Sequence, residues 1–377
     1  MATFGRMLRN GSEMVFDRLN AQGGLVGRHL EWTIYNSGCQ FEMARQATQQ
    51  AIADGFRFII GPICSEAAIG AALAAESEKA LLITPTATHP LVTVNEAGQT
   101  RPTIFRASYA TPFQGQAAAR FARDTLEANK AALLFDPLDD YASRLADAFA
   151  KQFTRQGGQV VYRATYALSE IDFTTSLQTI YDAGAQIIYL PAPASMVNQV
   201  AHQLHELGLA NSSLSFDTAS GLEVGLIRTR FETSPLMTSN PNSSTTLRTG
   251  LILLGSDSWQ SETLDLAATA GSYFTTHFAL ADNRETIQVW SSAYQATYAV
   301  EPTTIAALSY DAATILTEAI QQAGTFEIAT LVKVIEQSQY EGVTGQIAFD
   351  SQHNPIKPVP VMQIQDGQIL FSTLIFP

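Results

Sequence analysis

The amino-terminal third of the chain alternates between amphipathic segments with helical spacing and short apolar segments. Small or apolar residues recur every three or four positions at Gly11, Met14, Val15 and Leu19. This spacing predicts a helix with one buried stripe, ending at Gly23-Gly24. The continuous apolar run at 56–61 predicts a strand that is covered on both faces, as strands of parallel sheets are.

The same alternation continues along most of the chain. Helices are predicted at 44–53, 65–78, 112–126, 143–156, 173–183, 195–207, 264–270, 288–300, 305–323 and 328–337. Strands are predicted at 30–34, 80–84, 131–135, 159–165, 187–190, 251–255, 273–278, 346–349, 359–365 and 370–376, the last two joined by a hairpin turn at Asp366-Gly367. Strands that alternate with helices of this length indicate βαβ units, so the predicted fold class is α/β with parallel sheets.

Length and composition limit the organisation of the chain. Its 377 residues suggest two domains at about 150 residues each. The stretch 210–249, rich in Ser, Thr and Asn, is expected to be a surface insertion. No apolar run approaches the roughly 20 residues that a transmembrane helix needs.

Charge and motifs exclude several classes of function. With 22 Lys+Arg against 35 Asp+Glu, the formal charge is −13, which disfavours nucleic acid and anionic membranes as partners. The common phosphate-binding, nucleophile-elbow and zinc-protease motifs are absent from the sequence. We therefore expect no cofactor and no enzyme activity, although an α/β enzyme stays open as a remote alternative.

Cysteine and histidine give no sign of a metal site. Cys39 and Cys64 permit either one bridge or two free thiols, and neither belongs to a CxxC motif. His202 and His205 stand three residues apart on a predicted helix, but no third ligand is near in sequence. A plain surface pair is the simpler interpretation, and no metal is predicted.

Polar residues follow three predicted strands at their carboxyl ends, where open α/β sheets bind ligands. Ser65 begins the helix after strand 56–61, where its hydroxyl and the helix N–H groups either bind an anion or simply cap the helix. The turn Thr86-Ala87-Thr88 follows strand 80–84, and Asp257 follows strand 251–255. Each of these is open to a second interpretation as an ordinary turn residue.

Several segments, in order, resemble the branched-chain amino-acid binding proteins of ABC transporters, which have the type I periplasmic-binding fold. They are the opening FGRMLRNGSEMVFDRLNAQGG, then IIGPICSEAA, ITPTATHP, IFRASYATPFQG, LLGSDSW, SYFTTHF, ALSYDAA and EGVTGQIAFD. The resemblance covers nearly the whole chain except about 210–248. It implies two Rossmann-like lobes joined by three crossings, near 107–111, 275–278 and 342–345. Lobe one would be 1–108 plus 279–341, and lobe two 109–278 plus 342–377.

The resemblance also implies a disulfide and a set of ligand contacts. Cys39 and Cys64 match the family's disulfide cysteines. Ser65 would bind an anionic group, and Thr88 would offer its N–H and hydroxyl to the ligand. Ala87 and Thr86 would offer a backbone carbonyl to the ligand's ammonium, and Asp257 would pair with that ammonium from lobe two. The ring of Tyr141 would close over the ligand, and Tyr109 would line the pocket.

Some positions depart from the family. Ala142 stands where a glycine usually follows the tyrosine, Thr111 replaces an acidic residue, and Pro193-Ala194 replaces a tyrosine of some members. The changes at Thr111 and Pro193-Ala194 predict a less polar, roomier pocket, and Ala142 predicts a different local turn. Phe113 is as consistent with core packing as with lining that pocket.

The resemblance implies a protein that captures a small amino acid or related zwitterion by hinge closure and delivers it to an ABC permease. Such a protein would be a monomer in the periplasm or outside the cell, and it could carry a lipid anchor. A sensor for small amides or carboxylates on the same fold is the runner-up. Family members begin with a signal peptide and a first parallel strand, whereas this sequence starts at Met1 near the first helix. Both features are therefore expected to be missing, which suggests a start assigned too late or a shortened chain, and less readily a cytoplasmic variant.

Overall fold

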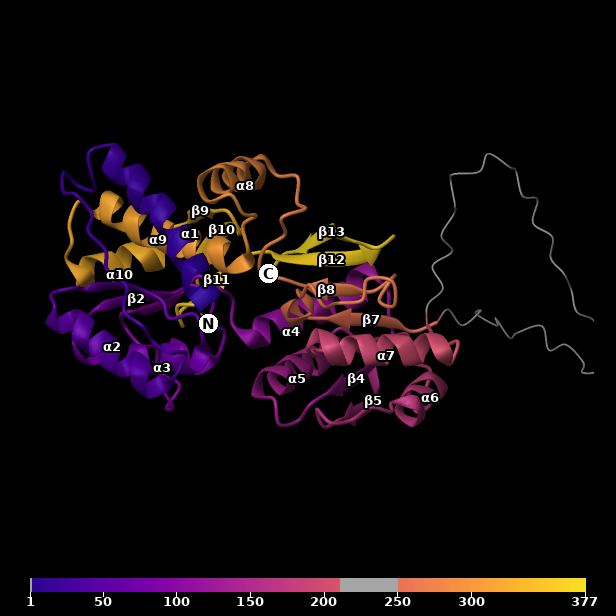
Figure 1. Cartoon of the computed structure of the whole chain (residues 1–377). Helices are drawn as coiled ribbons and strands as arrows, with labels where there is room; N and C mark the ends of the chain where they lie inside the picture. Colours follow the sequence, from indigo (N-terminus) through magenta and orange to yellow (C-terminus); the bar gives the residue numbers. More distant parts are fainter. Residues whose placement is uncertain (1, 211–249) are drawn as a thin grey trace, which may run out of the picture.

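The computed structural model describes residues 2–210 and 250–377, so nearly all of the predicted insertion at 210–249 lies outside the described residues. The elements gather into two bodies (Figure 1). We call lobe one the body that contains α1–α3, β1–β3, α8–α10 and β9–β11, and lobe two the body that contains α4–α7, β4–β8, β12 and β13. Within the described ranges, no helix is both long and apolar enough to cross a membrane.

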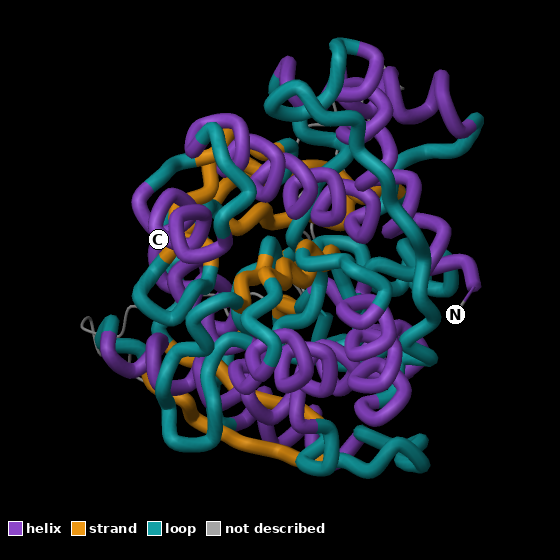
Figure 2. Tube along the Cα trace, turned by 90° about the vertical axis from the view of Figure 1, so that its left-hand side faces the viewer, coloured by secondary structure: helices purple, strands orange, loops and turns teal. Residues whose placement is uncertain are grey.

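Lobe one is built on a parallel sheet with strand order β1-β2-β3. Its strands are β1 (Phe58–Ile60), β2 (Leu81–Thr84) and β3 (Ile104–Arg106). Its helices are α1 (Ala2–Ala21), α2 (Phe41–Ala53), α3 (Ser65–Ser77), α8 (Glu285–Tyr298), α9 (Thr304–Ala323) and α10 (Ile328–Gln337). Successive residues of β2 face opposite sides: Leu82 packs with α2 and α3, and Ile83 with α9 and α10. Helices therefore cover both faces, as seen from the lobe-one side in Figure 2.

Lobe two contains a seven-stranded sheet of order β13-β12-β8-β7-β6-β4-β5. Its strands are β4 (Lys130–Phe135), β5 (Gln159–Thr165), β6 (Ile187–Tyr189), β7 (Ile252–Gly255), β8 (Tyr273–Thr275), β12 (Val359–Gln365) and β13 (Gln368–Ile375). Its helices are α4 (Thr111–Arg120), α5 (Asp140–Arg155), α6 (Thr174–Asp182) and α7 (Ala194–Glu206), with a π-helical segment at Phe121–Thr125 after α4. The strands β8, β7, β6, β4 and β5 pair in parallel, and β12 joins β8 antiparallel. The predicted α/β class is confirmed.

A small antiparallel sheet of β9 (Tyr340–Gly342), β10 (Gly345–Phe349) and β11 (Pro355–Ile356) packs on lobe one. The ring of Phe349 lies 5.3 Å from that of Phe105, and His353 Nδ1 lies 3.0 Å from the Ile104 carbonyl oxygen. The sequence assigned 342–377 to lobe two with a crossing at 342–345. In the structure β9–β11 pack on lobe one, whereas β12 pairs with β8 of lobe two, so the chain passes between the lobes after β11.

Two predicted elements are wrong. The segment 30–34 forms no strand, and Ile34 is 62% exposed, since no strand of the described chain pairs with it. The predicted helix at 264–270 is a series of turns. There the Asp265 carboxylate accepts the backbone N–H groups of Ala267 and Ala268, a local bonding pattern that competes with helix formation.

Cys39 and Cys64 form a disulfide, as the resemblance implied, with 5.4 Å between their Cα atoms. The bridge joins the turn before α2 to Cys64, the residue that precedes α3. A closed loop with a sequence separation of 25 residues stabilises the fold by about 3 kcal/mol in the chain-entropy model. The bond therefore fixes the position at which Ser65 begins its helix.

Candidate functional site

The three segments that cross between the lobes meet around Tyr109. Its hydroxyl donates to the Thr276 carbonyl at 2.6 Å, its ring stacks on His277 at 3.8 Å, and Lys357 Nζ lies 6.0 Å from the ring centroid. Phe113 contacts another part of the ring at 5.8 Å between centroids. Tyr109 is fully buried. Tyr109 therefore packs where the three crossing segments meet.

Lys357 belongs to a buried polar cluster at the third crossing. Its Nζ donates to Thr344 Oγ1 at 2.6 Å, and Asp311 accepts the backbone N–H groups of Val343 at 2.7 Å and Thr344 at 3.1 Å. Burial lowers the pKa of Lys357 to about 8, against the opposing effect of Asp311. A glycine is required at position 342, because a Cβ there would lie 2.7 Å from the Asp311 carboxylate. This cluster fixes the path of the chain where it leaves lobe one.

The lobe-one wall of the junction contains the predicted residues Ser65 and Thr86–Thr88. Ser65 is the first residue of α3, and its hydroxyl accepts the backbone N–H of His89 at 3.3 Å. The Thr86 hydroxyl donates to the Ile63 carbonyl at 2.7 Å. The loops after β1 and β2 are thereby held together. Cys64 offers no side-chain cap to α3, so the first N–H groups of this helix are available to an anion.

Arg106, which sequence reasoning missed, anchors the turn after β2. Its fully buried guanidinium donates to the carbonyl oxygens of Ala87 and His89, both at 2.9 Å, and to Thr93 Oγ1 at 3.0 Å. Burial lowers its pKa to about 9. The Ala87 carbonyl, predicted as an ammonium contact, is thus already engaged. The only signal in the sequence is a charged residue at the end of the apolar segment Ile104–Arg106.

The lobe-two wall is built around Asp257, in a 3-10 turn (Asp257–Trp259) that follows β7. Trp259 is fully buried, and its indole N–H donates to the Leu190 carbonyl at 3.0 Å. Its ring packs on Gly255, where a Cβ would lie 2.1 Å from the indole. The tryptophan therefore sets the turn that presents the Asp257 side chain, which is 28% exposed.

Two neutral side chains hold the Asp257 carboxylate. Gln114 Nε2 donates to Asp257 Oδ1 at 2.9 Å, and the Tyr141 hydroxyl donates to the same oxygen. Burial, and then the nearby Asp257, raise the pKa of Tyr141 well above its usual value, so the phenol stays protonated. His277 Nε2 lies 3.9 Å from Asp257 Oδ2, and burial lowers its pKa to about 4. The imidazole is therefore neutral near pH 7.

One helical turn links the two walls. Thr111, the first residue of α4, donates its backbone N–H to the Thr88 carbonyl at 3.0 Å, and the two hydroxyl oxygens lie 3.0 Å apart. Gln114, three residues later, binds Asp257. The predicted pair Thr88 and Asp257 is thus brought to one junction. Tyr141 contacts Asp257 directly. Ser65 contacts the turn that contains Thr88 through the backbone N–H of His89.

The lobes also touch directly. His89 Nε2 lies 3.3 Å from Asp140 Oδ2 at the start of α5, and the Thr304 hydroxyl donates to Gln260 Oε1 at 3.1 Å. Sequence reasoning did not identify His89 or Asp140, although both stand beside predicted site residues, in THP and DDY. Pro193 precedes α7 and brings no polar side chain to the junction.

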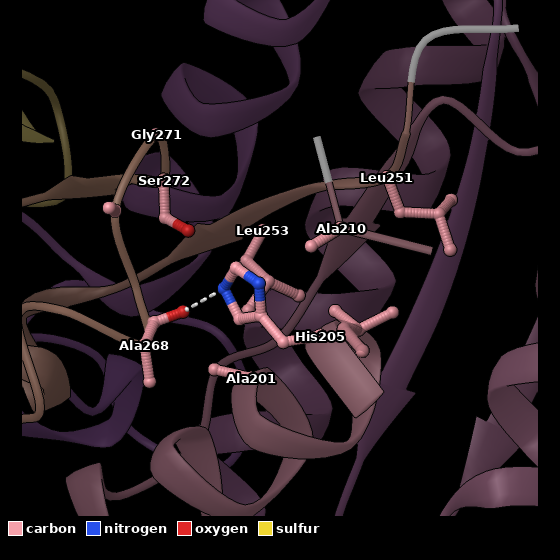
Figure 3. Close-up of a pocket in the computed structure, with 10 residues that line it drawn as sticks. Ala201, His205, Ala210, Leu251, Leu253, Ala268, Gly271 and Ser272 are labelled. Carbon is pink, nitrogen blue, oxygen red and sulfur yellow. Dashed lines mark hydrogen bonds between the residues drawn. The ribbon is translucent and has the colours of Figure 1, made fainter. Parts of the chain in front are cut away.

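Two cavities lie away from this junction. The one in Figure 3, bordered by His205, Leu253 and Ser272, has a volume of about 10 Å³, barely enough for one water molecule. A groove of about 450 Å³ runs along α3, with Leu73 and Leu91 among its apolar lining and Arg101, which is paired with Glu76. Neither cavity receives residues from both lobes. The junction is the better candidate because it brings donors and acceptors from two walls together.

Several known proteins are similar to this chain in sequence and in architecture. The chain is 27% identical to a leucine-, isoleucine-, valine-, threonine- and alanine-binding protein of Pseudomonas aeruginosa over 209 residues, 55% of each chain. The chain thus spans about half the length of this curated relative. A solved leucine-binding protein from Thermotoga maritima has a TM-score of 0.72 and 25% identity, over 100% of this chain and 95% of that one.

A solute-binding protein of an ABC transporter from R. palustris, solved with benzoate, has a TM-score of 0.69 and 17% identity, over 99% and 92% of the two chains. It shares the fold. The sequence model of the family described as "Periplasmic binding protein" matches residues 1–230 and 246–368. The chain belongs to the periplasmic binding protein family.

Proposed function

We propose that this protein captures a small α-amino acid or related zwitterion between its lobes and delivers it to an ABC permease. The observation that carries the proposal is the arrangement of Asp257. Its carboxylate is held by neutral donors on Oδ1, while the facing wall offers hydroxyl and helix N–H groups and no acidic side chain among Ser65 and Thr86–Thr88. A negative group on one wall and anion-binding groups on the other suit a zwitterion.

In this proposal the ligand's carboxylate binds Ser65, Thr88 and the N-terminus of α3, where the helix dipole favours negative charge. The ammonium binds Asp257, with the Thr86 carbonyl as a further acceptor, and Tyr141 covers the ligand from lobe two. Contacts with both lobes stabilise the closed arrangement. The contacts between His89 and Asp140 and between Thr304 and Gln260 belong to that closed form.

The partner and location follow from the family and from named relatives. The curated relative binds leucine, isoleucine, valine, threonine and alanine by its name, and the benzoate-bound neighbour is part of an ABC transporter. We therefore infer an ABC permease as the membrane partner and an extracytoplasmic location, with the chain acting as a monomer. Binding and release, without a chemical step, account for the groups at the junction, so we infer no enzyme activity.

A thermal-shift panel tests the proposal, because a ligand that binds only the folded state raises the melting temperature. The panel contains apolar L-amino acids, their amides, their des-amino acids and benzoates. We expect amino acids with free ammonium and carboxylate groups to raise the melting temperature most. If benzoate raises the melting temperature and amino acids do not, the proposed ligand class is wrong, and aromatic carboxylates replace amino acids as the ligands. The R. palustris neighbour was solved with benzoate.

A further inference from the structure

Gln114 lies at the centre of the junction but has no place among the ligand contacts proposed above. Its side chain is fully buried on α4. Its Nε2 donates to Asp257 Oδ1 at 2.9 Å and to Thr275 Oγ1 at 3.1 Å, and its Oε1 lies 3.0 Å from the Tyr141 hydroxyl. The amide nitrogen thus has two acceptors, Asp257 Oδ1 and Thr275 Oγ1, and these define the orientation of the side chain.

The two oxygens of Asp257 differ in their surroundings. Oδ1 accepts hydrogen bonds from Gln114 and Tyr141. Oδ2 accepts none from the described residues, and His277 Nε2, at 3.9 Å, is beyond hydrogen-bond distance. The carboxylate is therefore fixed by one oxygen while the other is uncommitted. Both donors on Oδ1 are neutral, and among residues 2–210 and 250–377 no arginine or lysine forms an ion pair with this carboxylate.

We infer that Gln114 is a positioning residue that makes the site selective for ligands with an ammonium group, by holding Asp257 with Oδ2 directed to the ligand. The inference rests on the proposed function, in which Asp257 is the ammonium contact. The low pKa of His277, about 4 because of burial, supports it, since a neutral imidazole does not compete with the ligand's ammonium.

The position of Gln114 on α4 adds a second argument. In an α-amino acid, one carbon separates the ammonium from the carboxylate, so the groups that bind them must be held at a fixed separation. Thr111 and Gln114, three residues apart, lie on one face of the helix. Thr111 contacts Thr88 of the first wall, and Gln114 contacts Asp257 of the second. The first turn of α4 therefore sets the distance between the two halves of the site.

Two substitutions at Gln114 test the inference. Gln114→Met keeps the length of the side chain and removes the donor, and Gln114→Glu keeps the shape and places a second carboxylate beside Asp257. Gln116→Met is the matched control, since Gln116 stands on the same helix and its side chain makes no hydrogen bond within the described residues. Leucine and its des-amino analogue 4-methylpentanoate serve as probes in calorimetric titrations from pH 6 to 8.5, with circular dichroism to check folding.

We expect Gln114→Met to weaken leucine binding about 10–100-fold, the range for a lost hydrogen bond to a charged group. The Gln114→Met variant should bind 4-methylpentanoate as the wild-type protein does, and the Gln116→Met control should bind both probes as the wild-type protein does. In Gln114→Glu the adjacent carboxylates share a proton, so leucine binding should be weak at pH 6 and recover toward pH 8.5. The other groups that face Asp257 stay neutral in this range, because burial raises the pKa values of Tyr109, Tyr141 and Tyr189 and lowers that of His277.

The outcomes separate the two claims. A wild-type protein that binds none of the apolar L-amino acids of the thermal-shift panel overturns the proposed function, and this inference with it. A wild-type protein that prefers leucine, together with a Gln114→Met variant that loses both probes equally or loses neither, overturns the inference alone. If Gln114→Met does not fold, the pH response of Gln114→Glu decides: recovery toward pH 8.5 supports the positioning role, and a flat profile contradicts it.

Discussion

The two walls of the junction are built in different ways. The lobe-one wall is a backbone structure, in which Arg106 holds the carbonyl groups of the turn after β2 and the disulfide fixes the residue before Ser65. The lobe-two wall is a set of side chains, in which Gln114 and Tyr141 hold the carboxylate of Asp257. The lobe-one wall presents hydroxyl and backbone groups and is anchored by buried and covalent contacts. The other carries a charge and depends on three side chains.

This difference separates stability from selectivity. Backbone N–H groups at a helix N-terminus attract any carboxylate, so the first wall recognises a chemical group common to many ligands. A fixed carboxylate accepts only ligands that can neutralise it, since an unpaired charge is costly to cover. Damage to the first wall should therefore reduce the stability of the fold, and damage to the second should change which ligands bind.

The largest effect on stability is expected from Arg106→Met. The substitution removes the charged donor of the buried carbonyl groups of Ala87 and His89, at about 1.5–3 kcal/mol for each hydrogen bond to a charged group. The carbonyl groups keep only longer contacts, with the Ser108 hydroxyl at 3.4 Å and the Val92 N–H at 3.2 Å. We expect the free energy of unfolding to fall by about 3–5 kcal/mol, measured by urea denaturation. Arg163→Met is the control, because Arg163 makes an exposed pair with Asp147. Equal stability of the two variants would refute the anchoring role of Arg106.

An intermediate effect is expected from His277 as the pH falls. Burial lowers its pKa to about 4 from an ordinary 6.5, so the folded state prefers the neutral ring. The stability from this preference is fully present above pH 6.5 and is lost as the pH falls through 4, a loss of about 3 kcal/mol for a fully buried group. His277→Phe keeps the stacking on Tyr109 and should lack this loss. Unfolding curves at pH 7 and pH 4 measure the difference, and parallel losses in both proteins would exclude His277 as the source.

The smallest effect is expected at the contact between the lobes. Asp140→Ala removes the partner of His89, and a contact of this exposure contributes about 0.2–1 kcal/mol. If only the closed form makes it, ligand affinity should fall no more than about fivefold, measured by calorimetry. The control is Asp147→Ala, whose partner Arg163 belongs to the same lobe. If Asp147→Ala lowered ligand affinity more than Asp140→Ala, the contact between His89 and Asp140 would not contribute to closure of the lobes on the ligand.

The fold was largely predictable because its signals are local and repeated. Strand Gln159–Thr165 and the hairpin at Asp366-Gly367, whose residues both have positive φ, were predicted at their observed positions. The short strands Ile104–Arg106, Tyr340–Gly342 and Pro355–Ile356 were missed, since two or three residues give little periodicity. The segment 30–34 alternates as a strand does, but strand formation also needs a neighbour, which the pattern of one segment cannot reveal.

The candidate site was predictable only in part. Ser65, Thr86, Thr88 and Asp257 follow strands, a position that sequence can show. Arg106 and Gln114 lie within a strand and a helix, and their importance comes from contacts with residues far along the chain. Tyr109 stays a predicted pocket residue, and the structure adds that the second crossing covers its ring with His277. Such packing depends on three crossings at once, which no local pattern specifies.

Calorimetric titration of leucine into the wild-type protein and the Asp257→Asn variant tests the central claim most directly. Asparagine keeps the shape of the side chain and removes its charge, so the cost of a lost charged partner, about 2–5 kcal/mol, should appear as a loss of affinity of about 30-fold or more. Binding of 4-methylpentanoate should not weaken, because it brings no ammonium group. Leucine affinity equal in the two proteins would contradict the claim that Asp257 selects the ligand by its charge.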